Sequence, residues 1–491
     1  MQSVQTRESL TLDPENWRHM RDLAHQALDE VMDMQMNIRN TPVWRPVPQV
    51  AETLLQQAAP MEGEGAERVI GDMLEHVIAY PSGHAHPRFW GWVCGTGTPI
   101  GMVADMLAAG VNASSGVFND ACSRVEIQLL EWMRELFDFP EGASGIVTSG
   151  ASMANVIGMA VARDAVLQED VRVRGLGALQ KTPVVYASGQ VHSSVDKAMM
   201  LLGMGSENLH KIAVDAGWRM DVSACEAAIR ADREAGLTPV AIIANAGTVN
   251  TGSIDDMEAL ADLAEREGLW LHVDGAIGAL AAMSPKLRQL LKGMSRADSL
   301  AFDFHKWLYV PYEAGCVLIR DGEAHRKSFS AAASYLEIPP RGVAALNDTS
   351  NIRGPQLSRG FKALKIWAQI RQFGIEKLGK LQEQNVADVA YLADLVKAHD
   401  DLELLSYYDL NILCFRYLPK NADEQQTDAF NQELLMRIQE SGVAVPSGTR
   451  LNGRFALRVA NTNHRTRRED FDLLIDETVR LANEMENDGF C

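Results

Sequence analysis

The sequence has few of the features that mark metal-binding, secreted or nucleic-acid-binding proteins. Its 491 residues include only six cysteines, and no two of them fall in a C-x-x-C or other metal-ligand spacing. We therefore expect reduced thiols and no metal site. Lysine and arginine total 46 against 65 acidic residues, a net charge of −19. Proteins that bind a phosphate backbone normally carry a basic excess, so nucleic acid is not an expected partner.

Long apolar runs are also missing. No segment approaches the roughly 20 apolar residues that a membrane-spanning helix needs, and the first residues lack the basic and apolar parts of a secretion signal. We expect a cytoplasmic protein without a membrane partner. The proportion of hydrophobic residues, 46%, is typical of folded domains.

The first 85 residues are expected to form a helical segment. Asp13 and Pro14 suit the N-cap and first turn of a helix, and apolar side chains recur on one face from Trp17 to Val31. A helix with such a face needs a partner surface.

Residues 86–365 predict a large α/β domain in which short apolar strands alternate with helices. The expected strands are 145–149, 184–188, 211–214, 240–246, 269–274, 299–304 and 315–320. Strands that are apolar throughout and separated by helices indicate a mostly parallel sheet covered on both faces. Residues 366–491 combine long amphipathic helices with strands expected at 410–418 and 454–460, which predicts a smaller α+β domain.

Lys306 is the first candidate for chemistry. It lies in the apolar run SLAFDFHKWLYV, where a free cation is expensive to bury. A lysine that snorkels from a strand end is one explanation. The other is a Schiff-base lysine, whose amine needs a lowered pKa and a carbonyl partner.

Two further features suit a phosphorylated cofactor with a ring nitrogen. Asp274 closes an apolar strand, and ligands of open α/β sheets bind beyond the carboxyl ends of strands, although a helix cap is the alternative. Gly150, Ala151 and Ser152 form a small-residue turn before a helix, which fits either a phosphate or plain capping. Pyridoxal phosphate needs a phosphate site, a carboxylate for its pyridine nitrogen and a lysine for its carbonyl.

His192 follows another predicted strand by a few residues. It could lie flat over a planar ring, although a lone histidine is more often a structural hydrogen-bonding residue.

Together these motifs resemble the pyridoxal-phosphate-dependent group II amino-acid decarboxylases, the family of the aromatic-L-amino-acid, histidine and glutamate decarboxylases. The matching pieces are HPRFWGW (86–92), TSGASMAN (148–155), QVHSSVDKA (190–198), NAGTVNTGSIDD (245–256), LHVDGA (271–276) and DFHKWLYVPYEAGCVLIRD (303–321). The resemblance implies the aspartate-aminotransferase type of fold and a homodimer whose N-terminal helices wrap the partner.

The resemblance also implies roles for individual residues. The catalytic set would be Lys306, which carries the cofactor, Asp274, which pairs with the ring nitrogen, and His192, which stacks on the ring. The other cofactor contacts would be Ala276 on the opposite face, Thr248 beside the ring, and Gly150, Ala151, Ser152 and His305 around the phosphate.

The implied reaction is the decarboxylation of an L-amino acid to an amine and carbon dioxide. Trp90, Trp92 and Phe118 lie in the region that lines the substrate pocket in relatives, which favours an aromatic or apolar substrate. Another pyridoxal enzyme of the same fold, such as an aminotransferase or a carbon–carbon lyase, is an alternative. A non-catalytic protein that kept the fold is a third.

One departure concerns the proton donor. Many family members carry a tyrosine in a loop over the site, whereas the aligned position here is Ser350. It lies in a segment (340–354) whose glycines, asparagines and small side chains fit a mobile loop over the site. Either another donor acts, such as His192 or a residue of the partner subunit, or oxidative deamination to an aldehyde competes.

Overall fold

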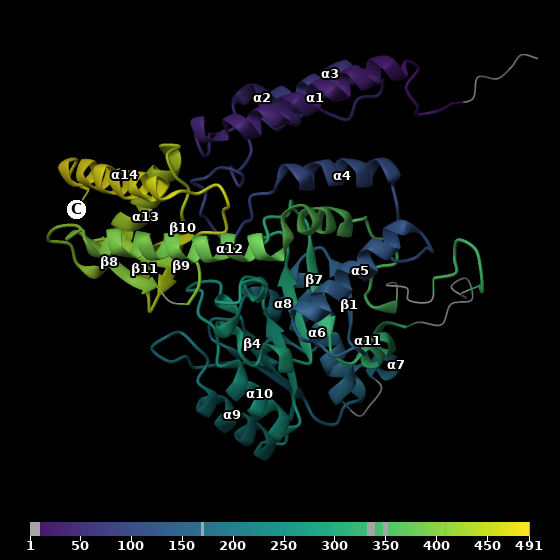
Figure 1. The fold of residues 1–491 in the computed structure, drawn as a ribbon. Coiled ribbons are helices and arrows are strands. Elements are labelled where there is room, and N and C mark those ends of the chain that lie inside the picture. The colour runs from purple at the N-terminus through teal and green to yellow at the C-terminus, as the bar shows by residue number, and fades with distance from the viewer. Residues whose placement is uncertain (1–9, 168–170, 331–338, 347–351, 408, 491) are drawn as a thin grey trace, which may run out of the picture. The chain divides into compact units, whose positions relative to one another are not determined.

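The computed structural model describes residues 10–167, 171–330, 339–346, 352–407 and 409–490. The chain divides into two compact units, Met1–Gly83 and His84–Cys491 (Figure 1). Ser350, the position expected to replace a loop tyrosine, lies outside the described residues.

The first unit is helical, as the sequence predicts. Its α-helices are α1 (Trp17–Asn37), α2 (Gln49–Leu55) and α3 (Ala66–Asp72). The expected start at Asp13 is wrong, because the Asn16 side chain caps α1 by accepting from the backbone N–H groups of Arg18 and His19 at 3.1 Å. Within α1, all of which is described, only Leu23 is buried, and Trp17 is 66% exposed.

The second unit contains a sheet of seven described strands in the order β1-β7-β6-β5-β4-β2-β3. The strands are β1 (Ser144–Thr148), β2 (Pro183–Ser188), β3 (Leu209–Ile212), β4 (Thr238–Asn245), β5 (Trp270–Asp274), β6 (Ser299–Asp303) and β7 (Gly315–Ile319). The five from β6 to β3 are parallel. Strand β7 is antiparallel to both of its neighbours, β6 and β1, so the edge strand β1 has the same direction as the five. This confirms the predicted, mostly parallel sheet.

Strand β3 begins two residues earlier than expected. Leu209 pairs with Val185 of β2, whereas Val214, expected to end the strand, forms an isolated antiparallel bridge with Met220. The local turn between Val214 and Met220 therefore competes with the sheet for this residue.

Helices cover both faces of the sheet, as the apolar strands predict. Along β4, Ile242 and Ala244 belong to the core on one face, while Ala241 and Ile243 belong to the core on the other. The helices of this domain are α4 (Pro99–Val111), α5 (Ala121–Leu136), α6 (Ala151–Val166), α7 (Val171–Arg174), α8 (Ser193–Leu201), α9 (Val222–Glu234), α10 (Met257–Glu267) and α11 (Gly322–Phe329). Among the described helices of the chain, none is both long and apolar enough to cross a bilayer.

The C-terminal part begins with the long helix α12 (Ala363–Lys397), which bends at Gly374 (φ 73°). A four-stranded antiparallel sheet follows in the order β10-β11-β9-β8, covered by two helices (Figure 1). These elements are β8 (Leu402–Tyr407), β9 (Ile412–Tyr417), α13 (Glu424–Glu440), β10 (Ser447–Leu451), β11 (Arg454–Ala460) and α14 (Arg468–Asn487). The predicted α+β character is confirmed, and β8 and β10 are strands that the sequence pattern did not indicate.

Candidate active site

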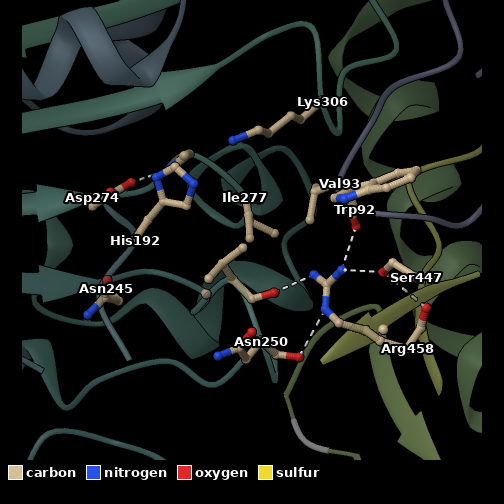
Figure 2. Close-up of a pocket in the computed structure, with 14 residues that line it drawn as sticks. Trp92, Val93, His192, Asn245, Asn250, Asp274, Ile277, Lys306, Ser447 and Arg458 are labelled. Atoms are coloured by element: carbon tan, nitrogen blue, oxygen red, sulfur yellow. Dashed lines mark hydrogen bonds between the residues drawn. The ribbon is translucent and has the colours of Figure 1, made fainter. Parts of the chain in front are cut away.

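A cavity of about 280 Å³ opens at the carboxyl ends of β4 and β5, facing β10 and β11 of the smaller sheet (Figure 2). Its lining residues are Trp92, Val93, His192, Asn245, Gly247, Val249, Asn250, Asp274, Ala276, Ile277, Lys306, Ser447, Gly448 and Arg458. The three residues predicted to be catalytic, Lys306, Asp274 and His192, therefore line the same cavity. Figure 2 shows the Lys306 amine pointing toward the side where Asp274 and His192 lie.

Asp274 is the last residue of β5 and is 5% exposed. Its Oδ1 accepts from the backbone N–H of Ala276 at 3.1 Å, and its Oδ2 accepts from the Asn155 amide at 2.9 Å. These two donors fix the orientation of the carboxylate at the strand end. Such a carboxylate can face the nitrogen of a bound pyridine ring.

His192 lies directly before α8 and caps its N-terminus. The Nδ1 atom accepts from the backbone N–H of Ser194 at 3.1 Å, so this nitrogen carries no proton. Burial lowers the pKa of His192 below its usual value. The imidazole is therefore neutral at pH 7 and holds its proton on Nε2.

Lys306 forms an ion pair that the sequence analysis missed. Its Nζ lies 2.9 Å from Oδ2 of Asp303, the last residue of β6. Burial alone would lower the pKa of Lys306, but the Asp303 carboxylate, with help from Asp274, raises it above its usual value. This direction is opposite to the lowered pKa that a Schiff-base lysine needs, and the sequence signal for the ion pair is the acid three residues before the lysine.

The predicted phosphate turn forms the start of α6, with Gly150 as the N-cap and Ala151 and Ser152 as the first two helical residues, and Gly150 lies next to His305. A Cβ added to Gly150 would lie 3.2 Å from Cε1 of His305. The backbone N–H of Ala151 donates to Asp303 Oδ1 at 2.7 Å, so in this structure a carboxylate occupies a donor expected to hold phosphate. Ser152, in the first turn of the helix, is exposed.

The chemistry of these groups fits pyridoxal phosphate. The N-terminus of α6 carries a positive partial charge, which suits a phosphate. Lys306 offers an amine for a carbonyl, and Asp274 offers a carboxylate for a ring nitrogen.

Ala276 and Thr248, the other two residues predicted to contact the ring, lie in different places relative to the cavity. Ala276 lines the cavity beside Asp274. Thr248 is buried between two lining residues, and its hydroxyl lies 2.9 Å from that of Thr251, so its side chain already has a partner. Contact between Thr248 and a ring remains a prediction.

The three predicted substrate-pocket residues are separated in the fold. Trp92 lines the cavity. Trp90 is fully buried in the core of the C-terminal domain, where its ring stacks on Phe471 at 4.8 Å. The backbone of Trp92 has a positive φ of 54°, which turns the chain between the two tryptophans. Phe118 is 39% exposed and does not belong to the lining residues.

Arg458 of β11 is a further lining residue that sequence reasoning missed. It is 3% exposed and donates to the backbone oxygens of Asn250 (3.1 Å), Trp92 (2.7 Å) and Val249, and to the Ser447 hydroxyl at 3.2 Å (Figure 2). These acceptors are all neutral. The cavity thus has a buried cation on the side opposite Asp274.

Comparison with known proteins places this site in a family. The pyridoxal-dependent decarboxylase conserved domain matches residues 48–418. An aromatic-L-amino-acid decarboxylase of Bacillus atrophaeus is 32% identical over 97% of this chain and 98% of its own length. A phenylacetaldehyde synthase of Arabidopsis thaliana is 28% identical over 91% of this chain and 93% of its own. A crystal structure of Oryza sativa TDC with PLP and tryptamine superposes with a TM-score of 0.88 at 26% identity, covering 97% of this chain and 100% of that one.

The chain belongs to the pyridoxal-dependent decarboxylase family. It is a pyridoxal-phosphate-dependent amino-acid decarboxylase with the aspartate-aminotransferase type of fold, as the sequence motifs predict.

Proposed function

We propose that this enzyme decarboxylates an aromatic L-amino acid to the corresponding amine and carbon dioxide. The observation that carries the proposal is the convergence of Lys306, Asp274 and His192 on one cavity whose wall includes Trp92. Val93 and Ile277 add apolar surface to the same wall, which suits an aromatic side chain. The likeness to the Bacillus aromatic-L-amino-acid decarboxylase supports the same substrate class.

Each catalytic residue has a distinct role in this proposal. Bound pyridoxal phosphate supplies an electron sink for the bond that breaks at the substrate α-carbon. Lys306 provides the amine that holds the cofactor through its carbonyl, and Asp274 holds a proton on the pyridine nitrogen. His192 packs over the ring, and its Nε2–H offers a hydrogen bond to the substrate carboxylate.

Ala276 is proposed to pack on the opposite face of the ring and Thr248 to contact its edge. The phosphate is proposed to lie at the N-terminus of α6. The proposed phosphate residues are Gly150, Ala151, Ser152 and His305.

A second candidate is decarboxylation coupled to oxidative deamination, in which the amino acid consumes dioxygen and water and yields an aldehyde, carbon dioxide, ammonia and hydrogen peroxide. The likeness to the Arabidopsis phenylacetaldehyde synthase favours including it, and the sequence has Ser350 where a loop tyrosine is expected. His192 is the proposed proton donor if the amine is the product.

We also propose a cytoplasmic homodimer. Residues 1–85 are the proposed dimerisation segment, because α1 leaves Trp17 and Met36 exposed, at 66% and 79%. Exposed apolar side chains on one helix are typical of a surface that a partner covers.

The test is a panel of L-amino acids assayed in parallel for carbon dioxide, amine, aldehyde and hydrogen peroxide. The proposal expects carbon dioxide and amine in equal amounts from an aromatic substrate. Aldehyde and peroxide in place of amine would establish the second candidate. Turnover of glutamate or another acidic amino acid, with none of an aromatic one, would contradict the substrate class.

A further inference from the structure

We propose that Asn155 is a positioning residue that links Asp274 to His192 and terminates a chain of buried hydrogen bonds running in from Trp270. The inference rests on the roles proposed above for Asp274 and His192. Asn155 lies on α6 behind the cavity and does not line it, so it acts only through these two residues.

The orientation of the Asn155 amide is determined by its neighbours. The amide nitrogen, Nδ2, lies 2.9 Å from Asp274 Oδ2 and 3.1 Å from Ser194 Oγ. A carboxylate only accepts hydrogen bonds, so the amide must present its nitrogen to Asp274. The amide oxygen consequently faces the other way, toward His272.

His272 is the next member of the chain. Its Nε2 lies 2.9 Å from Asn155 Oδ1, and because that oxygen can only accept, Nε2 must carry a proton. Burial lowers the pKa of His272 to about 4, so the ring is neutral at pH 7 and its Nδ1 has no proton. Nδ1 therefore accepts from the Ser299 hydroxyl, 2.7 Å away.

Trp270 is the first donor of this series of hydrogen bonds, at the end away from Asp274. Its indole Nε1–H can only donate, and it lies 2.7 Å from the Ser299 oxygen. Every bond from Trp270 through Ser299, His272 and Asn155 thus points its proton toward Asp274. Hydrogen bonds aligned in one direction polarise one another in a buried setting, so the chain stabilises negative charge on Asp274.

The second hydrogen of the Asn155 amide forms a branch to His192. It donates to Ser194 Oγ, whose own hydroxyl proton is then directed to His192 Nδ1 at 2.8 Å. This bond and the Ser194 backbone N–H both require an unprotonated Nδ1. One amide therefore joins the Ala276 N–H in orienting the Asp274 carboxylate and, through the Ser194 hydroxyl, joins the Ser194 N–H in holding the tautomer of His192.

Helix α6 leaves room for the imidazole ring of His272. Gly158 follows Asn155 by about one turn of α6, and a Cβ there would lie 2.7 Å from Cε1 and 2.8 Å from Nδ1 of His272. Any larger residue at this position would displace the imidazole ring from Asn155. The absence of a side chain at 158 is thus an independent sign that α6 is shaped around His272.

The test compares holoenzyme variants. Asn155→Leu keeps the volume and removes both branches, whereas Ser194→Ala removes only the branch to His192. Asn431→Leu is the matched control, because Asn431 is an equally buried asparagine in the C-terminal domain with bonds to Tyr417 and Thr427. The readouts are cofactor dissociation, kcat with the best substrate, and the imidazole nitrogen signals of ¹⁵N-histidine-labelled enzyme.

In wild-type enzyme we expect His272 and His192 to be neutral with the proton on Nε2. Asn155→Leu should raise the cofactor dissociation rate and lower kcat, each by about 10- to 100-fold, since a hydrogen bond to a charged group is lost. Ser194→Ala should lower kcat without the change in cofactor dissociation. Asn431→Leu should alter thermal stability alone.

Two results would overturn the inference. The first is a wild-type spectrum with His272 or His192 protonated on Nδ1. The second is an Asn155→Leu enzyme whose cofactor dissociation and kcat match those of Asn431→Leu. Because the nitrogen signals and cofactor release need no substrate, they remain decisive even if the proposed aromatic substrate class is wrong.

Discussion

Asp303, the last residue of β6, forms an ion pair with Lys306 in the loop that follows, with 2.9 Å between Oδ2 and Nζ. The same carboxylate accepts the backbone N–H of Ala151 at the start of α6. The group that holds the proposed cofactor lysine is therefore also the group that closes the proposed phosphate turn. A carbonyl bound to Lys306 is expected to affect the phosphate turn, and a phosphate bound at the turn is expected to affect Lys306.

The carboxylate of Asp303 should control the proton on Lys306. Asp303→Asn keeps an acceptor for Ala151 but removes the charge that raises the pKa of Lys306, so that pKa should fall. A lysine must be unprotonated to react with a carbonyl, so the variant should take up pyridoxal phosphate at lower pH than wild-type enzyme does. The measurement is the pH dependence of the uptake rate in cofactor-free enzyme, followed by the yellow absorbance.

Asp298→Asn is the control for the loss of a half-buried carboxylate directly before the first residue of β6, because Asp298 accepts from the backbone N–H of Leu271 and does not contact Lys306. Its uptake profile should resemble that of wild-type enzyme. If the uptake profile of Asp303→Asn matched those of wild-type and Asp298→Asn enzyme, Asp303 would not be the group that raises the pKa of Lys306.

Lys306 should be the residue that carries the cofactor. Lys306→Ala should abolish turnover while the protein stays folded, because its side chain ends in the cavity and not in the core. Borohydride reduction and peptide mapping of wild-type enzyme should find the pyridoxyl label on Lys306. Lys211→Ala, which changes a lysine paired with Asp196 on the surface, should keep both label and activity. A label on any other lysine would refute the assignment.

Asp274 should be indispensable for catalysis but not for folding. Asp274→Asn removes the carboxylate while the amide can still accept from Ala276, so the local backbone should persist. Loss of preorganised charge next to the reaction typically lowers kcat by about 10²- to 10³-fold, and we expect at least that much. Near-native turnover by the variant with cofactor bound would move the ring-nitrogen role to another residue.

Buried neutral histidines should make the enzyme sensitive to acid. Burial lowers the pKa of His325 to about 3, and its Nε2 donates to the Arg353 carbonyl at 2.7 Å. The unfolded chain takes up this proton near pH 6.5 while the folded chain does not, so stability is lost as pH falls from about 6.5 toward 3. One such group contributes about 1.4 kcal/mol per pH unit in that window.

The variant His325→Gln should reduce the slope of stability against pH between pH 6 and 4. The measurement is the midpoint of urea unfolding at several pH values, with His19→Gln on exposed α1 as the control. Equal slopes for the two variants would show that His325 titrates normally in the folded enzyme.

The proposed dimer should depend on the exposed apolar side chains of α1. Replacing Trp17 and Met36 by lysine should shift the sedimentation coefficient from that of a dimer to that of a monomer, because charges would be placed on a surface that a second copy is proposed to cover. The control is Arg18→Lys, which keeps the charge on the same helix. A monomeric wild-type enzyme would contradict the proposal directly.

The sequence predicted those parts of the fold and site that depend on local patterns. Buried parallel strands are apolar throughout, so β4 and β5 could be recognised, and the strand-end rule located Asp274. The long-range pairs could not be predicted in this way. Asn155 and His272 are 117 positions apart and carry no mark of their partnership in either segment.

Arg458 shows the same limit. It sits in the middle of β11, where an alternating pattern would predict either a solvent-facing cation or a core residue. What keeps it buried is a set of backbone oxygens from other segments of the chain, and backbone oxygens have no sequence signature. Trp90 and Trp92 likewise share one motif but lie in different places, and neither the positive φ of Trp92 nor the packing of Trp90 on Phe471 is marked in the sequence.

The position of Arg458 in the chain also has a consequence for biosynthesis. Ribosomes make proteins from the N-terminus, so His192, Asp274 and Lys306 emerge long before Arg458, Ser447 and Gly448. A nascent chain therefore carries the three residues of the cofactor side before it carries the opposite wall. The loop after Lys306 still depends on α12, because the Trp307 indole donates to Asn385. The order of synthesis is thus cofactor residues first, then the helix that holds their loop, and last the wall that carries Arg458.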